Sequence, residues 1–157
     1  LSWEPNARIV LHGVSMGAAT VLMASGEDLP GNVKAVIADC GYTSEWDEFQ
    51  READALHIPW FPVLNATSVL SKIRDGYDFK QASAIAQVKK SRIPTLFIHG
   101  SSDELVPYSM LGELYAAAAC EKEELTVEGA GHALSSSVAP TLYWRTVEDF
   151  IAKYLDR

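Results

Sequence analysis

The chain has 157 residues, a formal net charge of −8 at pH 7 and a hydrophobic content of 48%. This length and composition fit one folded domain with a substantial core and exclude a disordered chain. With 13 basic against 21 acidic residues, the chain lacks the clustered Lys and Arg of a nucleic-acid-binding surface, so we expect no nucleic-acid partner.

The first predicted elements are a strand over residues 8–12 and a helix over residues 16–25, joined by the string Gly-Val-Ser-Met-Gly. Small residues on either side of a serine allow the sharp strand-to-helix turn of a nucleophile elbow, which lifts the hydroxyl to the carboxyl end of a parallel sheet. The string also fits an ordinary strand-to-helix turn. Only a catalytic acid and a histidine further along the chain can distinguish a nucleophile elbow from such a turn. Ser15 is the candidate nucleophile.

A second strand is predicted over residues 33–38, and Asp39 at its end is a reserve candidate for a catalytic acid. Residues 41–79 then interrupt the alternation of strands and helices with a segment rich in aromatic residues and proline, for which we expect short helices. Its aromatic residues either contact a substrate or form the segment's own packing core.

The third strand, residues 95–99, leads into a loop that contains Asp103, and a fourth strand, residues 125–128, ends just before His132. Further helices are expected over residues 82–91, 108–119 and 140–154. Strands that alternate with helices predict an α/β fold with a parallel sheet of about four strands, and ligands bind such sheets at the carboxyl ends of the strands.

The order serine, acid, histidine along the chain is the order of an α/β-hydrolase triad. A serine hydroxyl is a weak nucleophile until an imidazole accepts its proton, and a carboxylate must orient that imidazole and stabilise it as a cation. Ser15, His132 and Asp103 are predicted to fill these roles. The other histidines, His12, His57 and His99, do not follow the last strand. We expect His12 and His99 to be packed or bonded to backbone, and His57 falls within residues 41–79.

The strings Gly-Val-Ser-Met-Gly, His-Gly-Ser-Ser-Asp-Glu-Leu-Val-Pro and Gly-Ala-Gly-His resemble the α/β-hydrolase superfamily, and in particular bacterial hydrolases of the serine aminopeptidase and prolyl-oligopeptidase-like branch. The resemblance covers about residues 8–155. It implies a serine hydrolase acting on an ester, thioester or amide of a small-molecule or peptide acyl group, with no cofactor. It also implies that residues 41–79 are a helical lid, in which Trp46, Trp60 and Phe61 are candidate substrate contacts.

The resemblance fails at the beginning of the chain, because members of the superfamily carry several strands and a helix before the elbow. We therefore expect residues 1–157 to be the C-terminal part of one hydrolase domain whose N-terminal half is a missing partner. The backbone N–H of Met16 can still donate to an oxyanion, but the second backbone N–H of the oxyanion hole, which a loop before the elbow supplies in the superfamily, is missing. Two hypotheses stay open: an active hydrolase, and an inert half-domain that acts as an assembly module. An exposed strand at residues 8–12 also invites a homodimer.

The two cysteines, Cys40 and Cys120, are expected to be buried or partly buried thiols, and the four histidines are spread too widely to predict a metal site. The sequence shows no signal peptide and no long apolar run. The expectation is a cytoplasmic chain, with a signal or an anchor ahead of residue 1 left open.

Overall fold

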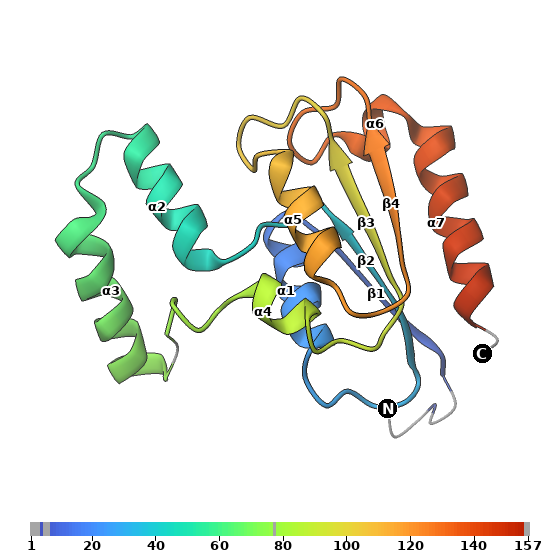
Figure 1. Ribbon diagram of the computed structural model, residues 1–157, viewed down its shortest axis with the longest axis horizontal. Coiled ribbons are helices and arrows are strands. Elements are labelled where there is room, and N and C mark those ends of the chain that lie inside the picture. Colours follow the sequence, from blue (N-terminus) through green and yellow to red (C-terminus); the bar gives the residue numbers. More distant parts are fainter. Residues whose placement is uncertain (1–3, 5–6, 77, 156–157) are drawn as a thin grey trace.

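A parallel four-stranded sheet forms the centre of the protein (Figure 1). The structure, a computed structural model, describes residues 4, 7–76 and 78–155. The strands lie in the order of the chain: β1 (Ile9–Val14), β2 (Val33–Asp39), β3 (Thr95–Gly100) and β4 (Lys122–Val127). The helices are α1 (Met16–Ser25), α2 (Glu45–Ala55), α3 (Trp60–Asp75), α4 (Ala84–Val88), α5 (Ser109–Ala117), α6 (Ser135–Val138) and α7 (Pro140–Leu155).

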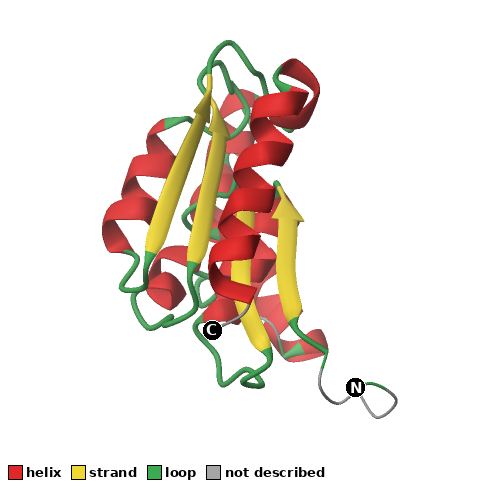
Figure 2. Cartoon of the chain, turned by 90° about the vertical axis from the view of Figure 1, so that its right-hand side faces the viewer, coloured by secondary structure: helices red, strands yellow, loops and turns green. Residues whose placement is uncertain are grey.

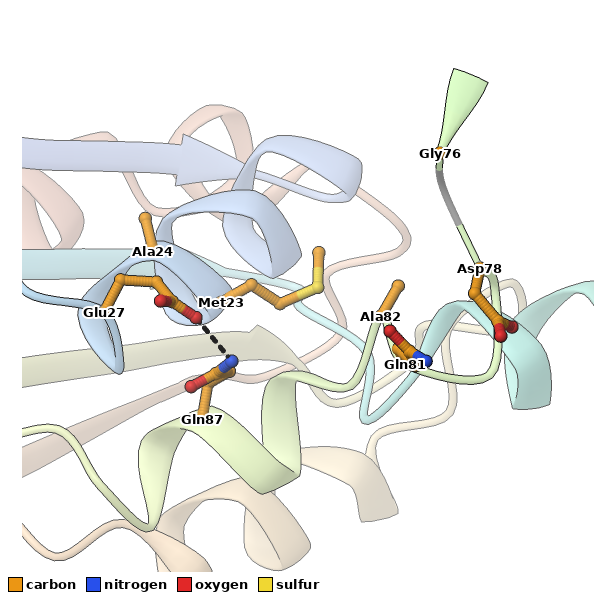
Figure 3. A pocket seen from close by; sticks show the side chains of 8 residues that line it. All are labelled: Met23, Ala24, Glu27, Gly76, Asp78, Gln81, Ala82 and Gln87. Atoms are coloured by element: carbon orange, nitrogen blue, oxygen red, sulfur yellow. Dashed lines mark hydrogen bonds between the residues drawn. The ribbon is translucent and has the colours of Figure 1, made fainter. Parts of the chain in front are cut away.

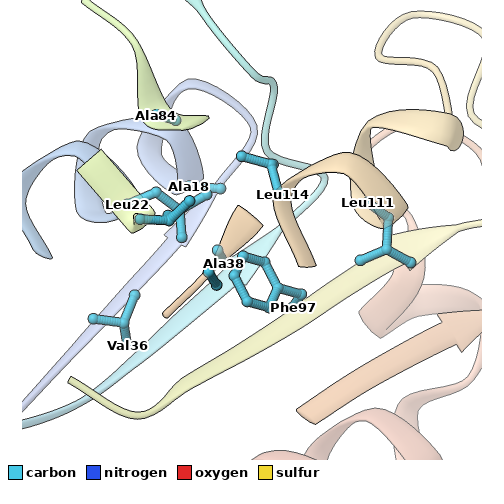
Figure 4. Close-up of a cluster of buried hydrophobic side chains, with 10 residues drawn as sticks. Ala18, Leu22, Val36, Ala38, Ala84, Phe97, Leu111 and Leu114 are labelled. Carbon is cyan, nitrogen blue, oxygen red and sulfur yellow. The ribbon is translucent and has the colours of Figure 1, made fainter. Parts of the chain in front are cut away.

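Helices cover both faces of the sheet, with α1, α4 and α5 on one face and α7 on the other (Figures 1 and 2). Because successive side chains of a strand point to opposite faces, Val36 and Ala38 of β2 pack under α1 and α5, whereas Ala35 and Ile37 pack under α7. Figure 4 shows the first of these clusters, centred on Phe97. Burial on both faces explains the uninterrupted apolar stretches at residues 35–38 of β2 and 96–98 of β3.

The predicted fold class is confirmed, and the differences from prediction are shifted ends of elements and one short helix that was not expected. The fourth strand begins at Lys122, three residues earlier than expected, because its first residues are the charged ones of a half-exposed edge strand. The helix expected over residues 82–91 is the short α4, and α6 was not predicted at all.

Residues 41–79 form two helices, α2 and α3, which extend away from the sheet as an arm (Figure 1). The side chain of Ser44 caps α2 by accepting the N–H of Asp47 at 3.1 Å. The helix α3 packs against α2 and leaves large apolar side chains exposed, such as Ile73 at 78%. That this arm acts as a lid remains a prediction. Within the described residues, no helix is both long and apolar enough to cross a membrane.

The strand β1 lies at one edge of the sheet and, in the described part of the chain, pairs only with β2. The N–H groups of Ile9 and Ser15 both donate toward β2, to Asn32 and Asp39. Because N–H directions alternate along a strand, the N–H of Val10 points toward the open edge.

We predict that two copies of the chain pair through this edge and sediment at twice the 17.2 kDa of one chain. The variant Val10→Pro should sediment as a monomer, because proline removes an outward N–H without breaking a bond to β2. Sedimentation velocity measures both, and a wild-type monomer at high protein concentration would contradict the prediction.

Candidate active site

The candidate nucleophile Ser15 lies at the junction of β1 and α1 with a backbone conformation of φ 56° and ψ −119°. A non-glycine residue with positive φ stores about 1–3 kcal/mol of strain, which the surrounding structure must hold. The N–H of Ser15 donates to the carbonyl oxygen of Asp39 at 2.8 Å, which ties the turn to the end of β2. The elbow predicted from the sequence is thus present as a strained turn.

The two glycines of the elbow differ in what they do. A Cβ on Gly13 would lie 2.1 Å from the carbonyl oxygen of Gly17, so a larger residue at 13 would collide with backbone. A Cβ on Gly17 itself would meet no atom within 4 Å. Only Gly13 is required for the close approach of β1 and α1.

Three side chains meet at the carboxyl ends of the strands, as the sequence predicted. The hydroxyl of Ser15 lies 2.7 Å from Nε2 of His132, and Nδ1 of His132 lies 2.9 Å from a carboxylate oxygen of Asp103. A carboxylate only accepts, so Nδ1 carries the proton and Nε2 is left to accept from the serine O–H. This tautomer is the one that a general base for Ser15 requires.

The carboxylate of Asp103 is fully buried and receives several N–H donors. Its Oδ1 accepts the backbone N–H groups of Leu105 and Val106, each at 3.0 Å. Nε2 of His99 lies 3.0 Å from the carbonyl oxygen of Val106 and 3.2 Å from Oδ2 of Asp103. Because a carbonyl oxygen only accepts, this nitrogen carries a proton and donates it to Val106. These donors compensate for the water that a buried carboxylate loses.

The remaining histidines lie away from Ser15. His99 is buried and bonded to backbone, as expected. His12 is exposed and its Nε2 lies 3.0 Å from the hydroxyl of Tyr143. His57 is exposed in the turn between α2 and α3.

The reserve acid Asp39 is buried next to the site but faces another partner. Its Oδ1 accepts the hydroxyl of Ser135 at 3.0 Å, and burial raises the pKa of its carboxyl group above the ordinary value. Asp39 therefore links the elbow, through its backbone oxygen, to the segment that follows His132, through its side chain.

A cavity of about 300 Å³ opens beside Ser15. Its other lining residues come from α2 and from the loops after β2 and β3: Met16, Tyr42, Glu45, Glu48, Phe49, Glu52, Leu105 and Val106. Met16 is the first residue of α1, so its N–H has no acceptor one turn earlier and is free to face an oxyanion.

The predicted substrate contacts Trp46, Trp60 and Phe61 are not among the described residues that line this cavity. The ring of Trp46 lies 4.4 Å from the ammonium of Lys80, and the rings of Trp60 and Phe61 pack edge to face. The aromatic residues that line the cavity are Tyr42 and Phe49. The sequence did not indicate that the glutamates of α2 line this cavity, because acidic residues on one face of a helix are typical of a helix exposed to solvent.

A second cavity of about 300 Å³ lies between α1 and the segment that follows α3 (Figure 3). Its lining includes Glu27 and Gln87, which are hydrogen-bonded to each other, but neither Ser15 nor His132. It offers no nucleophile and no oriented base.

One group of described side chains has the proximity that a metal site needs, since the donor atoms of Cys40, Asp103 and His132 lie within 4.8 Å of one another. Burial raises the pKa of the Cys40 thiol to about 12, so the sulfur stays protonated at neutral pH and is a poor ligand. Asp103 and His132 are already bonded to each other. Both cysteines are free thiols, Cys40 buried and Cys120 partly buried, as predicted.

Comparison with known proteins identifies the family. A profile described as "Prolyl oligopeptidase family" matches residues 3–157. The chain belongs to the prolyl oligopeptidase family. Within the curated relatives, it is 31% identical to the uncharacterized protein YqkD of Bacillus subtilis over 144 residues, which are 91% of this chain and 47% of that protein. It is also 31% identical to the alpha/beta hydrolase domain-containing protein WAV2 of Arabidopsis thaliana, over 94% of this chain and 48% of that protein.

Solved structures of other proteins share the fold. An acylaminoacyl peptidase of Pyrococcus horikoshii superimposes with a TM-score of 0.69 at 18% identity, over 100% of this chain and 26% of that chain. An esterase of Pyrococcus furiosus superimposes with a TM-score of 0.68 at 18% identity, over 94% of this chain and 55% of that chain. This prolyl oligopeptidase family chain therefore spans about half the length of the curated relatives it matches.

The steric difference between the two elbow glycines predicts opposite outcomes for the same substitution. Gly13→Ala should lower the free energy of unfolding by about 3 kcal/mol, because two backbone segments must separate. Gly17→Ala should change it by less than about 1 kcal/mol, since the methyl group enters open space on a helix. Urea unfolding followed by circular dichroism measures both, and equal losses for the two variants would contradict the assignment.

Proposed function

We propose that this chain carries the catalytic groups of a serine hydrolase that cleaves esters, thioesters or amides through an acyl-enzyme. The observation that carries the proposal is the continuous hydrogen-bonded line from Ser15 through His132 to Asp103. The strained elbow and the family membership support it. The substrate is a small molecule or a peptide with a scissile acyl group, and no cofactor takes part.

In the first half of the proposed reaction, the oxygen of Ser15 attacks the substrate carbonyl while Nε2 of His132 takes its proton. Asp103, held by its N–H donors, stabilises the imidazolium that forms. The imidazolium then protonates the leaving alcohol, thiol or amine as its bond to the acyl carbon breaks. In the second half, water attacks the acyl-enzyme, gives its proton to His132, and the acid leaves as Ser15 recovers a proton.

The N–H of Met16 supplies one donor for the oxyanion of each tetrahedral intermediate. A second donor is expected from sequence that precedes β1 in the longer relatives, because those proteins are about twice the length matched here. Loss of one such donor lowers turnover by roughly 10²- to 10³-fold. The full rate is thus proposed for the whole protein, and the chain alone is proposed to retain an activated serine.

The second candidate function is an inert half-domain that serves as an assembly module. The open edge of β1 favours it, because such an edge pairs readily with another strand. The two functions differ in whether Ser15 is activated in the isolated chain, and a covalent probe separates them.

We predict that a fluorophosphonate probe labels Ser15 of the purified chain, and that Ser15→Ala and His132→Ala abolish labelling. The matched pair Asp103→Asn and Asp39→Asn tests which acid serves His132. Asp103→Asn should slow labelling by up to about 10⁴-fold, because the amide favours the wrong imidazole tautomer. Asp39→Asn should slow labelling by less than about tenfold, since the side chain of Asp39 only holds the loop after His132 in place through Ser135.

The measurement is the second-order rate of labelling, with circular dichroism to show that each variant is folded. A folded wild type that does not react would contradict the proposed function and favour the inert module. Equal losses for Asp103→Asn and Asp39→Asn would contradict the assignment of the acid.

A further inference from the structure

The face of α2 that lines the Ser15 cavity carries three carboxylates. Glu45, Glu48 and Glu52 are spaced by three and four residues, which places them on one side of a helix, and all three line the cavity. Under the proposed function this cavity receives the substrate, because Ser15 and Met16 both line it. The glutamates therefore decide what kind of group fits there.

Little positive charge offsets these carboxylates. Nη1 of Arg51 lies 3.5 Å from Oε2 of Glu48, and Nη2 of the same residue donates to the carbonyl oxygen of Leu105. Arg51 thus neutralises at most one of three charges. Glu45 accepts a hydrogen bond from the hydroxyl of Tyr42 at 3.3 Å, which leaves its charge in place.

Glu48 also holds a polar atom with unused bonding capacity. Its Oε2 is buried and, in the part of the chain that the structure describes, has no hydrogen-bond partner. Burial raises the pKa of this carboxyl group and the nearby Arg51 lowers it by less, so the charged form is only partly compensated in the free protein. A cation in the cavity would supply that compensation.

The rest of the lining is largely apolar. Met16, Phe49, Leu105 and Val106 contribute hydrocarbon surface to the same cavity as Ser15 and the three glutamates. A cavity of about 300 Å³ has room for an extended side chain. An apolar stem that ends in a positive charge matches both parts of the lining.

We propose that this site selects substrates that carry a positive charge, such as an ammonium or guanidinium group, on an apolar stem next to the scissile carbonyl. The proposal rests on the proposed function, since it names the substrate class for Ser15. Glu48 and Glu52 are the specificity-determining residues, and they act on binding of the charged group, at a distance from the proton transfers of His132.

The experiment compares two fluorophosphonates with the same short alkyl stem, one ending in a trimethylammonium group and one in a tert-butyl group. The two probes have the same shape and differ in a single atom, so the ratio of their labelling rates reports charge alone. We expect the cationic probe to react at least about tenfold faster with the wild type. The ratio should fall as salt is added, because salt screens the carboxylates.

The double variant Glu48→Gln/Glu52→Gln should bring the ratio close to one. The single variant Glu52→Gln should lower the ratio, and Asp54→Asn is its matched control: it removes one charge from the same helix at an exposed position outside the cavity lining, and it should keep the wild-type ratio. If the double variant does not fold, the wild-type ratio and its salt dependence still decide the proposal.

Equal rates of the two probes with the wild type would overturn the proposal and leave the proposed function standing, because Ser15 would still be labelled. A ratio that survives the double variant would overturn the assignment to α2. Failure of both probes to label folded protein would overturn the proposed function, and this inference with it.

Discussion

The register of β1 against β2 is the constraint on which the site depends. The N–H of Ser15 donates to the end of β2, and the absence of a Cβ at Gly13 lets α1 start directly beneath it. Both contacts hold a backbone conformation that a serine would otherwise avoid. The strain at the nucleophile is thus balanced by contacts to a buried strand, since β2 packs under helices on both faces.

The same end of β2 also fixes the base. The backbone oxygen of Asp39 accepts the N–H of Ser15, and its carboxylate accepts the hydroxyl of Ser135. One residue therefore sets the distance between the turn that carries Ser15 and the loop that carries His132. On the other side, two backbone N–H groups anchor Asp103 to its own loop, and His99 holds that loop through the carbonyl oxygen of Val106. The arrangement needs no flexible element, because each of the three side chains leaves a rigid strand within a few residues.

The sequence was sufficient for the parts of the molecule in which local pattern and burial agree. Apolar runs that end in Ser15, Asp103 and His132 predicted the sheet and the residues that converge on it, because parallel strands present their carboxyl ends at one edge. Prediction from the sequence was wrong where contacts between distant segments determine the structure. Lys122 begins a strand although it is charged, and Glu48 lines a cavity although its helix has a polar pattern. The aromatic residues of the insertion misled for the same reason, since Trp46 finds its partner in Lys80.

The arm formed by α2 and α3 leaves and re-enters the body at adjoining points. Ser44 and Ser83 form a β-bridge, and backbone bonds join Glu45 to Ala82 and Ile85 to Thr43. Everything between these points is a closed excursion whose length and composition do not alter the path of the sheet. Evolution can therefore exchange the arm as a unit, and with it the charge of the cavity wall, while the distance between Ser15 and His132 stays fixed.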